Sequence, residues 1–218
     1  QPMHVCAPTG ENFVKGTSFS APWISRKMAY LICTLGFSRE VAKALIIDAA
    51  AGWDRKDDVS CSIGYGVVPQ RIEDIVKTPD DEIRFVMMGT TDAYETYTYR
   101  IPVPIYNDKQ PFYARATLCY FPKCVRDQGV DYTTTEMDIH FGRVKEKGGK
   151  AVIASINSNS QGDDGGCHLH EPEARQLYRK WDNVKLISEE LKERAVPRKV
   201  YGAGMWGLSI KTKERLKE

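Results

Sequence analysis

The sequence predicts an α+β fold in which helices occupy the first third of the chain and an antiparallel, jelly-roll-like β-sandwich follows. Within residues 1–78, apolar side chains recur at the three-to-four-residue spacing of an amphipathic helix. Beyond position 79, apolar and polar side chains alternate, as they do in half-buried strands. A turn cluster at 77–81 (Lys-Thr-Pro-Asp-Asp) separates the two patterns, so we expect one domain over 1–78 and a second over 79–218.

Two long helices and a short one are expected in the first domain, after a strand and loop over 1–15. The first helix should end at Gly36, because glycine is favoured just after a helix. Its apolar stripe consists of Trp23, Ile24, Met28, Leu31, Ile32 and Leu35. Ser38 is the expected N-cap of the second helix, whose buried side would be Val41, Ala44, Leu45 and Ala49. A charged surface loop over 53–60 and a short helix over 69–76 complete the domain.

Strands account for most of the second domain. The alternating patterns cover 83–87, 97–101, 113–121, 137–141, 151–156 and 205–212. Within 171–194 the pattern is ambiguous, since a helix over 172–180 and a strand over 183–187 are both compatible with it. The basic tail fits a solvated strand end (Lys211, Lys213, Arg215 and Lys217). Several short strands separated by turn signals are typical of an antiparallel sandwich.

The composition indicates which kinds of binding partner and which cellular location to expect for the protein. The 31 basic and 29 acidic residues nearly cancel, so nothing indicates binding to nucleic acid or to an anionic membrane. No apolar run reaches the length of about 18 residues that a membrane span needs. Six scattered cysteines, at 6, 33, 61, 119, 124 and 167, lack the density of a small secreted disulfide scaffold. We therefore expect free thiols, a buried Cys33 and a cytoplasmic location, with secretion as the alternative.

Residues 16–22 (Gly-Thr-Ser-Phe-Ser-Ala-Pro) have an unusual composition for a helix start. Ser18 should lie in the first turn, where free backbone N–H groups and the helix dipole favour developing negative charge. We expect Thr17 to be the N-cap and Gly16 to allow close approach of another chain. Pro22 removes the hydrogen bond to the Ser18 carbonyl. A small serine at a loosened helix start suits a nucleophile, although a capped helix with a tolerated proline fits the same pattern.

The same stretch resembles the signature around the catalytic serine of subtilisin-like serine proteases (subtilases), Gly-Thr-Ser-x-Ala/Ser-x-Pro. Residues 5–10 (Val-Cys-Ala-Pro-Thr-Gly) resemble the Ala-Pro-Gly segment that precedes this serine in the family. Residues 64–69 (Gly-Tyr-Gly-Val-Val-Pro) are similar to the Gly-x-Gly turn that closes the catalytic domain. Many subtilases carry a β-sandwich after that domain. Residues 99–104 and 138–143 further resemble segments of the bacterial subtilases that accompany AAA ATPases.

The resemblance implies hydrolysis of peptide bonds by acyl transfer, with Ser18 as nucleophile, Gly16, Thr17 and Pro22 as its support, and no cofactor. The backbone N–H of Ser18 would be one oxyanion donor. The aspartate and histidine motifs of the family do not occur in these residues, so we expect them on a segment before Gln1. The chain alone is therefore expected to be an inactive fragment of a serine endopeptidase.

Four partners follow from this interpretation: a peptide or protein substrate, the missing N-terminal catalytic segment, an AAA ATPase, and a second copy of the chain. The second copy would bind an exposed apolar helix face that includes some of Ile24, Met28 and Leu31. The alternative comes from another class of protein. It is a non-catalytic β-sandwich binding module in which the subtilase remnant is only a scaffold.

Other candidate groups have weaker support. His4 matches no catalytic motif, and His140 should point outward from its strand. A possible zinc site consists of Cys167, His168 and His170, with Cys119 or Cys124 as a remote donor. The spacing is not that of a standard zinc finger, and the surrounding Gly and Asp residues favour a flexible loop. We therefore predict no metal.

Overall fold

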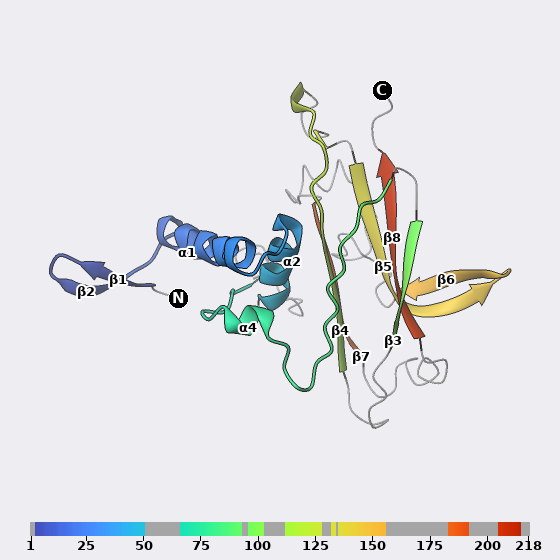
Figure 1. Ribbon diagram of the computed structural model, residues 1–218, viewed down its shortest axis with the longest axis horizontal. Coiled ribbons are helices and arrows are strands. Elements are labelled where there is room, and N and C mark those ends of the chain that lie inside the picture. The colour runs from blue at the N-terminus through green and yellow to red at the C-terminus, as the bar shows by residue number, and fades with distance from the viewer. Residues whose placement is uncertain are drawn as a thin grey trace, which may run out of the picture.

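The computed structural model describes residues 3–50, 66–92, 96–102, 112–127, 132–133, 135–155, 183–191 and 205–214. Its elements form three groups that lie side by side: helices, then a two-stranded sheet, then a four-stranded sheet (Figure 1). A separate hairpin of β1 (Met3–Ala7) and β2 (Gly10–Val14) lies at the helical end. The described residues thus form a mixed α+β fold whose strands all pair antiparallel in small sheets.

The helical group contains α1 (Thr17–Ala29), a π-helical continuation η1 (Tyr30–Thr34), α2 (Arg39–Ala49) and α4 (Glu73–Val76). Gly36 ends the first helix in a left-handed conformation (φ 74°), as predicted. Ser38 caps α2, because its hydroxyl accepts a hydrogen bond from the Val41 N–H at 3.3 Å. The short helix expected over 69–76 is confined to α4, and the loop over 53–60 lies outside the described residues.

The helices pack around one apolar core. Its buried members are Leu31, Val41, Ala42, Leu45, Ile46 and Ile75. The prediction that some of Ile24, Met28 and Leu31 would lie on an exposed face is wrong. Leu31 is completely buried in this core with residues of α2 and α4, and Ile24 and Met28 are half-buried. Cys33 is exposed rather than buried, because it lies about half a turn away from Leu31. The exposed face of the helix carries Phe19 and Tyr30 instead.

The strands form two sheets. The four-stranded sheet has the order β3 (Thr96–Pro102), β8 (Met205–Glu214), β5 (Thr135–Lys147) and β6 (Lys150–Ser155). The two-stranded sheet pairs β4 (Phe112–Cys119) with β7 (Val184–Leu191). Five of the six expected strands are confirmed, and β7 shows that 183–187 is a strand, whereas 172–180 lies outside the described residues. The strand expected over 83–87 is absent, because this stretch does not join either sheet.

The two-stranded sheet lies between α2 and the four-stranded sheet (Figure 1). On one face of β4, the Thr117 hydroxyl donates a hydrogen bond to the Asp48 carboxylate of α2 at 3.1 Å. Beyond β4, the Tyr120 hydroxyl accepts a hydrogen bond from the Met137 N–H of β5 at 3.2 Å. The apolar residues Ile139, Ile187 and Trp206 are buried among the strands. The chain therefore links all three layers by both polar and apolar contacts.

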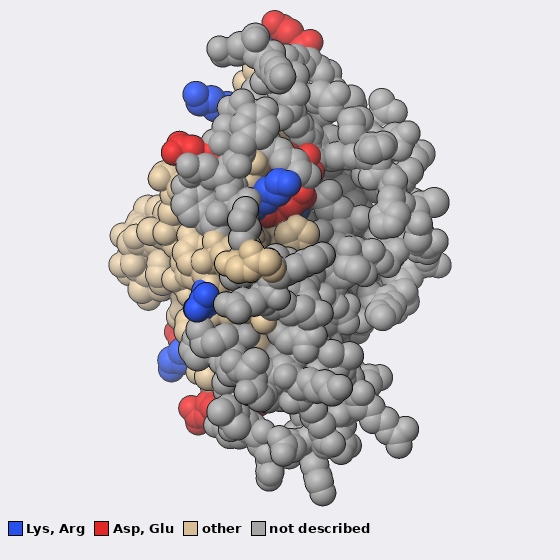
Figure 2. Space-filling model, turned by 90° about the vertical axis from the view of Figure 1, so that its right-hand side faces the viewer, with Lys and Arg blue, Asp and Glu red and all other residues tan. Residues whose placement is uncertain are grey.

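On the side that carries the four-stranded sheet, the described residues form no charge patch of a single sign (Figure 2). There the acidic and basic side chains of the described residues are interspersed (Figure 2). His140 on β5 and Lys211 on β8 are both exposed, as the strand patterns predicted. No helix in the described part of the chain combines the length and hydropathy needed to cross a bilayer.

Candidate functional site

Ser18 is the second residue of α1 and is exposed to solvent. The next two N–H groups, of Phe19 and Ser20, donate to the Gly16 carbonyl at 3.1 and 3.3 Å. Neither the hydroxyl nor the N–H of Ser18 forms a hydrogen bond with the described residues. The amino end of α1 lies beside the hairpin, at the end of the molecule far from the sheets (Figure 1). Ser18 therefore offers a free hydroxyl and a free main-chain donor at an accessible helix start.

Gly16, not Thr17, is the N-cap of α1, which corrects the prediction for Thr17. The helix begins one residue earlier than expected, so Thr17 is its first residue and its side chain makes no capping hydrogen bond. Gly16 has φ 148° and ψ 152°, a conformation that is almost restricted to glycine. A Cβ at this position would only meet Phe19, at an ordinary 3.7 Å. The requirement for glycine is thus conformational rather than steric.

Pro22 lies inside α1, as predicted. It has no N–H, so the carbonyl of Ser18 loses the hydrogen bond that a helix would normally give it. The neighbouring Ser20 differs from Ser18, because its hydroxyl donates to the carbonyls of Gly16 and Thr17 at 3.4 and 3.3 Å. Of the two serines in this turn, Ser18 has a hydroxyl without a partner among the described residues, whereas the hydroxyl of Ser20 is engaged with the backbone.

No described side chain is positioned as a base for Ser18. Lys27 lies nine residues further along α1, which places it on the opposite face and about 13 Å away along the helix axis. Its ammonium donates to the Gln70 carbonyl and lies 4.2 Å from the centre of the Trp23 ring. His4 pairs instead with Glu11 across the hairpin, with 2.9 Å between Nε2 and Oε2. The geometry among the described residues therefore supplies a nucleophile and a donor, but no proton acceptor.

The electrostatic environment of Lys27 is unusual. Burial is the main cause that lowers the pKa of its amine, and the neighbouring Arg26 lowers it further, while Asp74 and Glu73 partly oppose this. The side chain is almost completely buried, so its charge is stabilised by the Gln70 carbonyl and the Trp23 ring. The role of Lys27 is to hold α1 against the segment that leads into α4.

The zinc prediction concerns residues that lie partly outside the described part of the chain. Cys167, His168 and His170 are not described. Among the residues that are described, no three His, Cys, Asp or Glu side chains come close enough to hold a metal ion. Cys119 and Cys124 are both free thiols. Burial raises the pKa of the Cys119 thiol to about 11, so it is a poor ligand near neutral pH.

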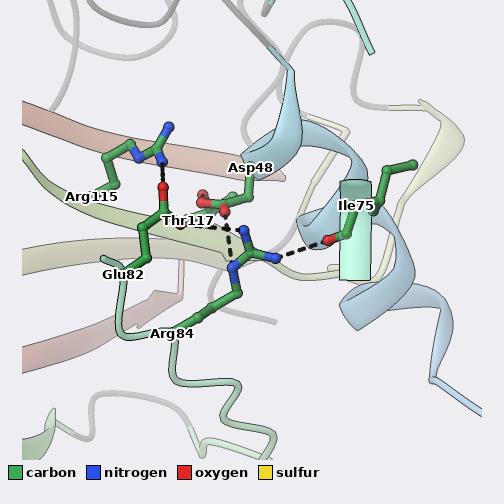
Figure 3. Close-up of polar contacts among 6 residues, drawn as sticks. All are labelled: Asp48, Ile75, Glu82, Arg84, Arg115 and Thr117. Atoms are coloured by element: carbon green, nitrogen blue, oxygen red, sulfur yellow. Dashed lines mark hydrogen bonds and ion pairs between the residues drawn. The ribbon is translucent and has the colours of Figure 1, made fainter. Parts of the chain in front are cut away.

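A second polar cluster joins the helices to the sheet, and sequence analysis did not identify it. Arg84 donates from Nη1 to the Ile75 carbonyl at 2.8 Å and lies 3.8 Å from the Asp48 carboxylate and 3.7 Å from that of Glu82 (Figure 3). Glu82 also contacts Arg115 of β4 at 3.5 Å. The alternation around Arg84 resembles a strand, so its inward direction could not be recognised from the sequence. We name this group the junction cluster; its members are Asp48, Ile75, Glu82, Arg84, Arg115 and Thr117.

Comparison of the chain with protein-family models, with curated proteins and with solved structures gives no significant match to any of them.

Proposed function

We propose that this chain is the nucleophile-bearing part of a subtilisin-like serine endopeptidase. The observation that carries the proposal is Ser18, whose exposed hydroxyl and free N–H lie together in the first turn of α1. The hydroxyl would attack a peptide carbonyl, and the N–H would donate to the oxyanion that forms. The special conformation of Gly16 and the lost hydrogen bond at Pro22 are consistent with a helix start shaped for this role.

In this proposal the aspartate and histidine of the triad come from a polypeptide segment outside these 218 residues. That segment would approach Ser18 from the exposed side of α1, where Phe19 and Tyr30 each remain 41% accessible. Without the histidine, the hydroxyl stays protonated and unreactive at neutral pH. The chain alone would then bind no substrate productively and hydrolyse none.

We further propose that the two sheets form a β-sandwich that accompanies the catalytic part. The burial of Ile139 and Ile187 and the hydrogen bond from Met137 to Tyr120 support face-to-face packing of the sheets. An AAA ATPase is a proposed partner of the complete protein, on the strength of the resemblance at 99–104 and 138–143.

Proteolysis of a fluorogenic casein tests the proposed function. The 218-residue chain should be inactive, whereas the polypeptide encoded by the full reading frame should cleave the substrate. Ser18→Ala should abolish that cleavage. The matched variant Ser20→Ala should retain it within a few-fold, because the Ser20 hydroxyl is already engaged with the carbonyls of Gly16 and Thr17. Activity that survives Ser18→Ala would show that Ser18 is not the nucleophile. A full-length product with no activity would support the binding-module alternative instead.

A further inference from the structure

The residues between α4 and β3 include an apolar stretch that no sheet covers. Ile83, Phe85, Val86, Met87 and Met88 are exposed to 57%, 49%, 53%, 41% and 69%. We call residues 83–88 the apolar segment. It runs as an extended trace past β4 toward the upper ends of β3 and β8 (Figure 1). Large apolar side chains that lie together on a protein surface are a mark of an interaction site.

The apolar segment is held in place by two contacts, one near its start and one just after its end. Within it, Arg84 is only 17% exposed and is anchored to Ile75 and Asp48 through the junction cluster. Three residues beyond it, the Thr91 hydroxyl accepts a hydrogen bond from the Thr212 hydroxyl of β8 at 2.9 Å. Anchors on both sides reduce the conformational entropy that the segment would lose when a partner orders it.

The backbone of the apolar segment has no hydrogen-bond partner among the described residues, and the segment belongs to neither sheet. An extended backbone with free donors and acceptors can pair with another extended chain, as an edge strand does. The exposed side chains would then contact alternate side chains of that chain.

Charge restricts which chain would fit. Exposed Asp80 and Asp81 precede the apolar segment and exposed Asp92 follows it, whereas Lys77 is the one exposed basic residue in 77–92. A second copy pairing through the same segment would bring these acidic ends together, in either direction, which is unfavourable. A peptide with an apolar, extended core and basic residues at its ends would be favoured.

We propose that the apolar segment binds an extended peptide of another protein by β-augmentation, and that this peptide carries basic residues on both sides of an apolar core. The pairing needs neither Ser18 nor a triad, so it is independent of the proposed protease function. It supplies a way for the strand-rich part of the chain to recruit a protein.

Fluorescence anisotropy with the full 218-residue chain tests the proposal. The probe is a labelled ten-residue peptide, Lys-Lys-Val-Thr-Ile-Thr-Val-Thr-Lys-Lys, and its comparison peptide has glutamate in place of every lysine. The lysine-flanked peptide should bind at least 10-fold more tightly, and its affinity should fall as salt is added. Equal binding of the two peptides, or no binding of either, would overturn the proposal.

Two proline variants test whether the backbone of the apolar segment pairs with the peptide. Neighbouring N–H groups of an extended chain point to opposite edges, so at least one of Phe85→Pro and Val86→Pro should weaken peptide binding 10-fold or more. Both positions lie outside the helices and strands, and thermal unfolding would verify that the variants remain folded. The matched control is Val67→Ser, since Val67 is exposed to 57% elsewhere on the surface and its loss should leave binding unchanged.

A measurement of self-association tests whether a second copy of the chain occupies the apolar segment instead. Sedimentation velocity should give the same oligomeric state for the wild-type chain and for a Phe85→Ser, Met88→Ser double variant. If the wild-type chain forms a dimer that the double variant loses, the occupant of the apolar segment is a second copy and the proposed peptide partner is wrong.

Discussion

The guanidinium of Arg84 donates a hydrogen bond to the carbonyl of Ile75 at 2.8 Å. This carbonyl belongs to the last turn of α4, where the helix itself leaves carbonyl groups without partners. The same guanidinium lies beside Asp48 near the end of α2. One side chain from the connecting segment therefore satisfies the end of one helix and neutralises a carboxylate on another, so it fixes where the helical group meets the strands.

Replacing this side chain should destabilise the fold. Arg84→Met is expected to lower the free energy of unfolding by about 1–3 kcal/mol, because it leaves the half-buried Asp48 carboxylate and the Ile75 carbonyl with fewer partners. Urea unfolding followed by circular dichroism measures the change. The matched control is Arg71→Met, since Arg71 pairs with Glu73 on the open surface and should contribute little. Equal effects of the two substitutions would contradict this role for Arg84.

Sequence patterns predicted the elements better than their contacts. The cap at Ser38, the stop at Gly36 and five strands could be predicted because they depend on local backbone chemistry and on periodicity. The partner of an apolar face does not depend on local sequence. The pattern therefore did not show that the apolar face of the first helix, with Leu31, packs against α2, nor that Arg84 lies outside a strand.

The candidate site could also be predicted only in part. The position of Ser18 in the first turn and of Pro22 inside the helix followed from residue types. The N-cap was predicted at Thr17 because threonine is a good capping residue, but the backbone conformation of Gly16 moved the helix start by one residue. Side-chain preference was the weaker of the two effects at this helix start.

The conformation of Gly16 leads to a prediction about stability. Gly16→Ala should destabilise the chain by about 1–3 kcal/mol, because an L side chain is strained at φ 148° and ψ 152°. Gly89→Ala is the control, since Gly89 has no positive φ and a Cβ there would meet only the Tyr99 hydroxyl at 3.8 Å. Thermal unfolding should give a clearly lower midpoint for Gly16→Ala alone. A midpoint equal to that of Gly89→Ala would show that the helix start tolerates a side chain.

The lowered pKa of Lys27 predicts a pH dependence. Between the pKa of the folded state and the ordinary lysine value of 10.5, the unfolded chain holds more protons than the folded chain does. The free energy of unfolding contributed by this group should therefore rise as pH increases through that window. Chemical unfolding at several pH values from neutral to alkaline would measure the slope for the wild type and for Lys27→Met. The rise of the free energy of unfolding with pH should disappear in Lys27→Met. It should persist in the control Lys77→Met, because the side chain of Lys77 is exposed. Parallel curves for the wild type and Lys27→Met would refute the prediction.

Cys119 should react more slowly than the exposed cysteines. Its pKa of about 11, against the ordinary cysteine value of 9.0, reduces the thiolate fraction at pH 8 roughly 100-fold. Timed alkylation with iodoacetamide, followed by peptide mass spectrometry, compares it with Cys6, Cys33 and Cys124 in the same sample. These three exposed thiols are internal controls. Modification of Cys119 within threefold of their rates would mean that β4 does not protect it.

A fluorophosphonate probe gives the most direct test of the central claim, which is that Ser18 is a nucleophile awaiting a base. The probe should label the full-length gene product at Ser18 with one-to-one stoichiometry, and peptide mapping should find no label in Ser18→Ala but full label in Ser20→Ala. The 218-residue chain alone should remain unlabelled. Label on another residue of the full-length product, or rapid stoichiometric labelling of the chain alone, would contradict the account.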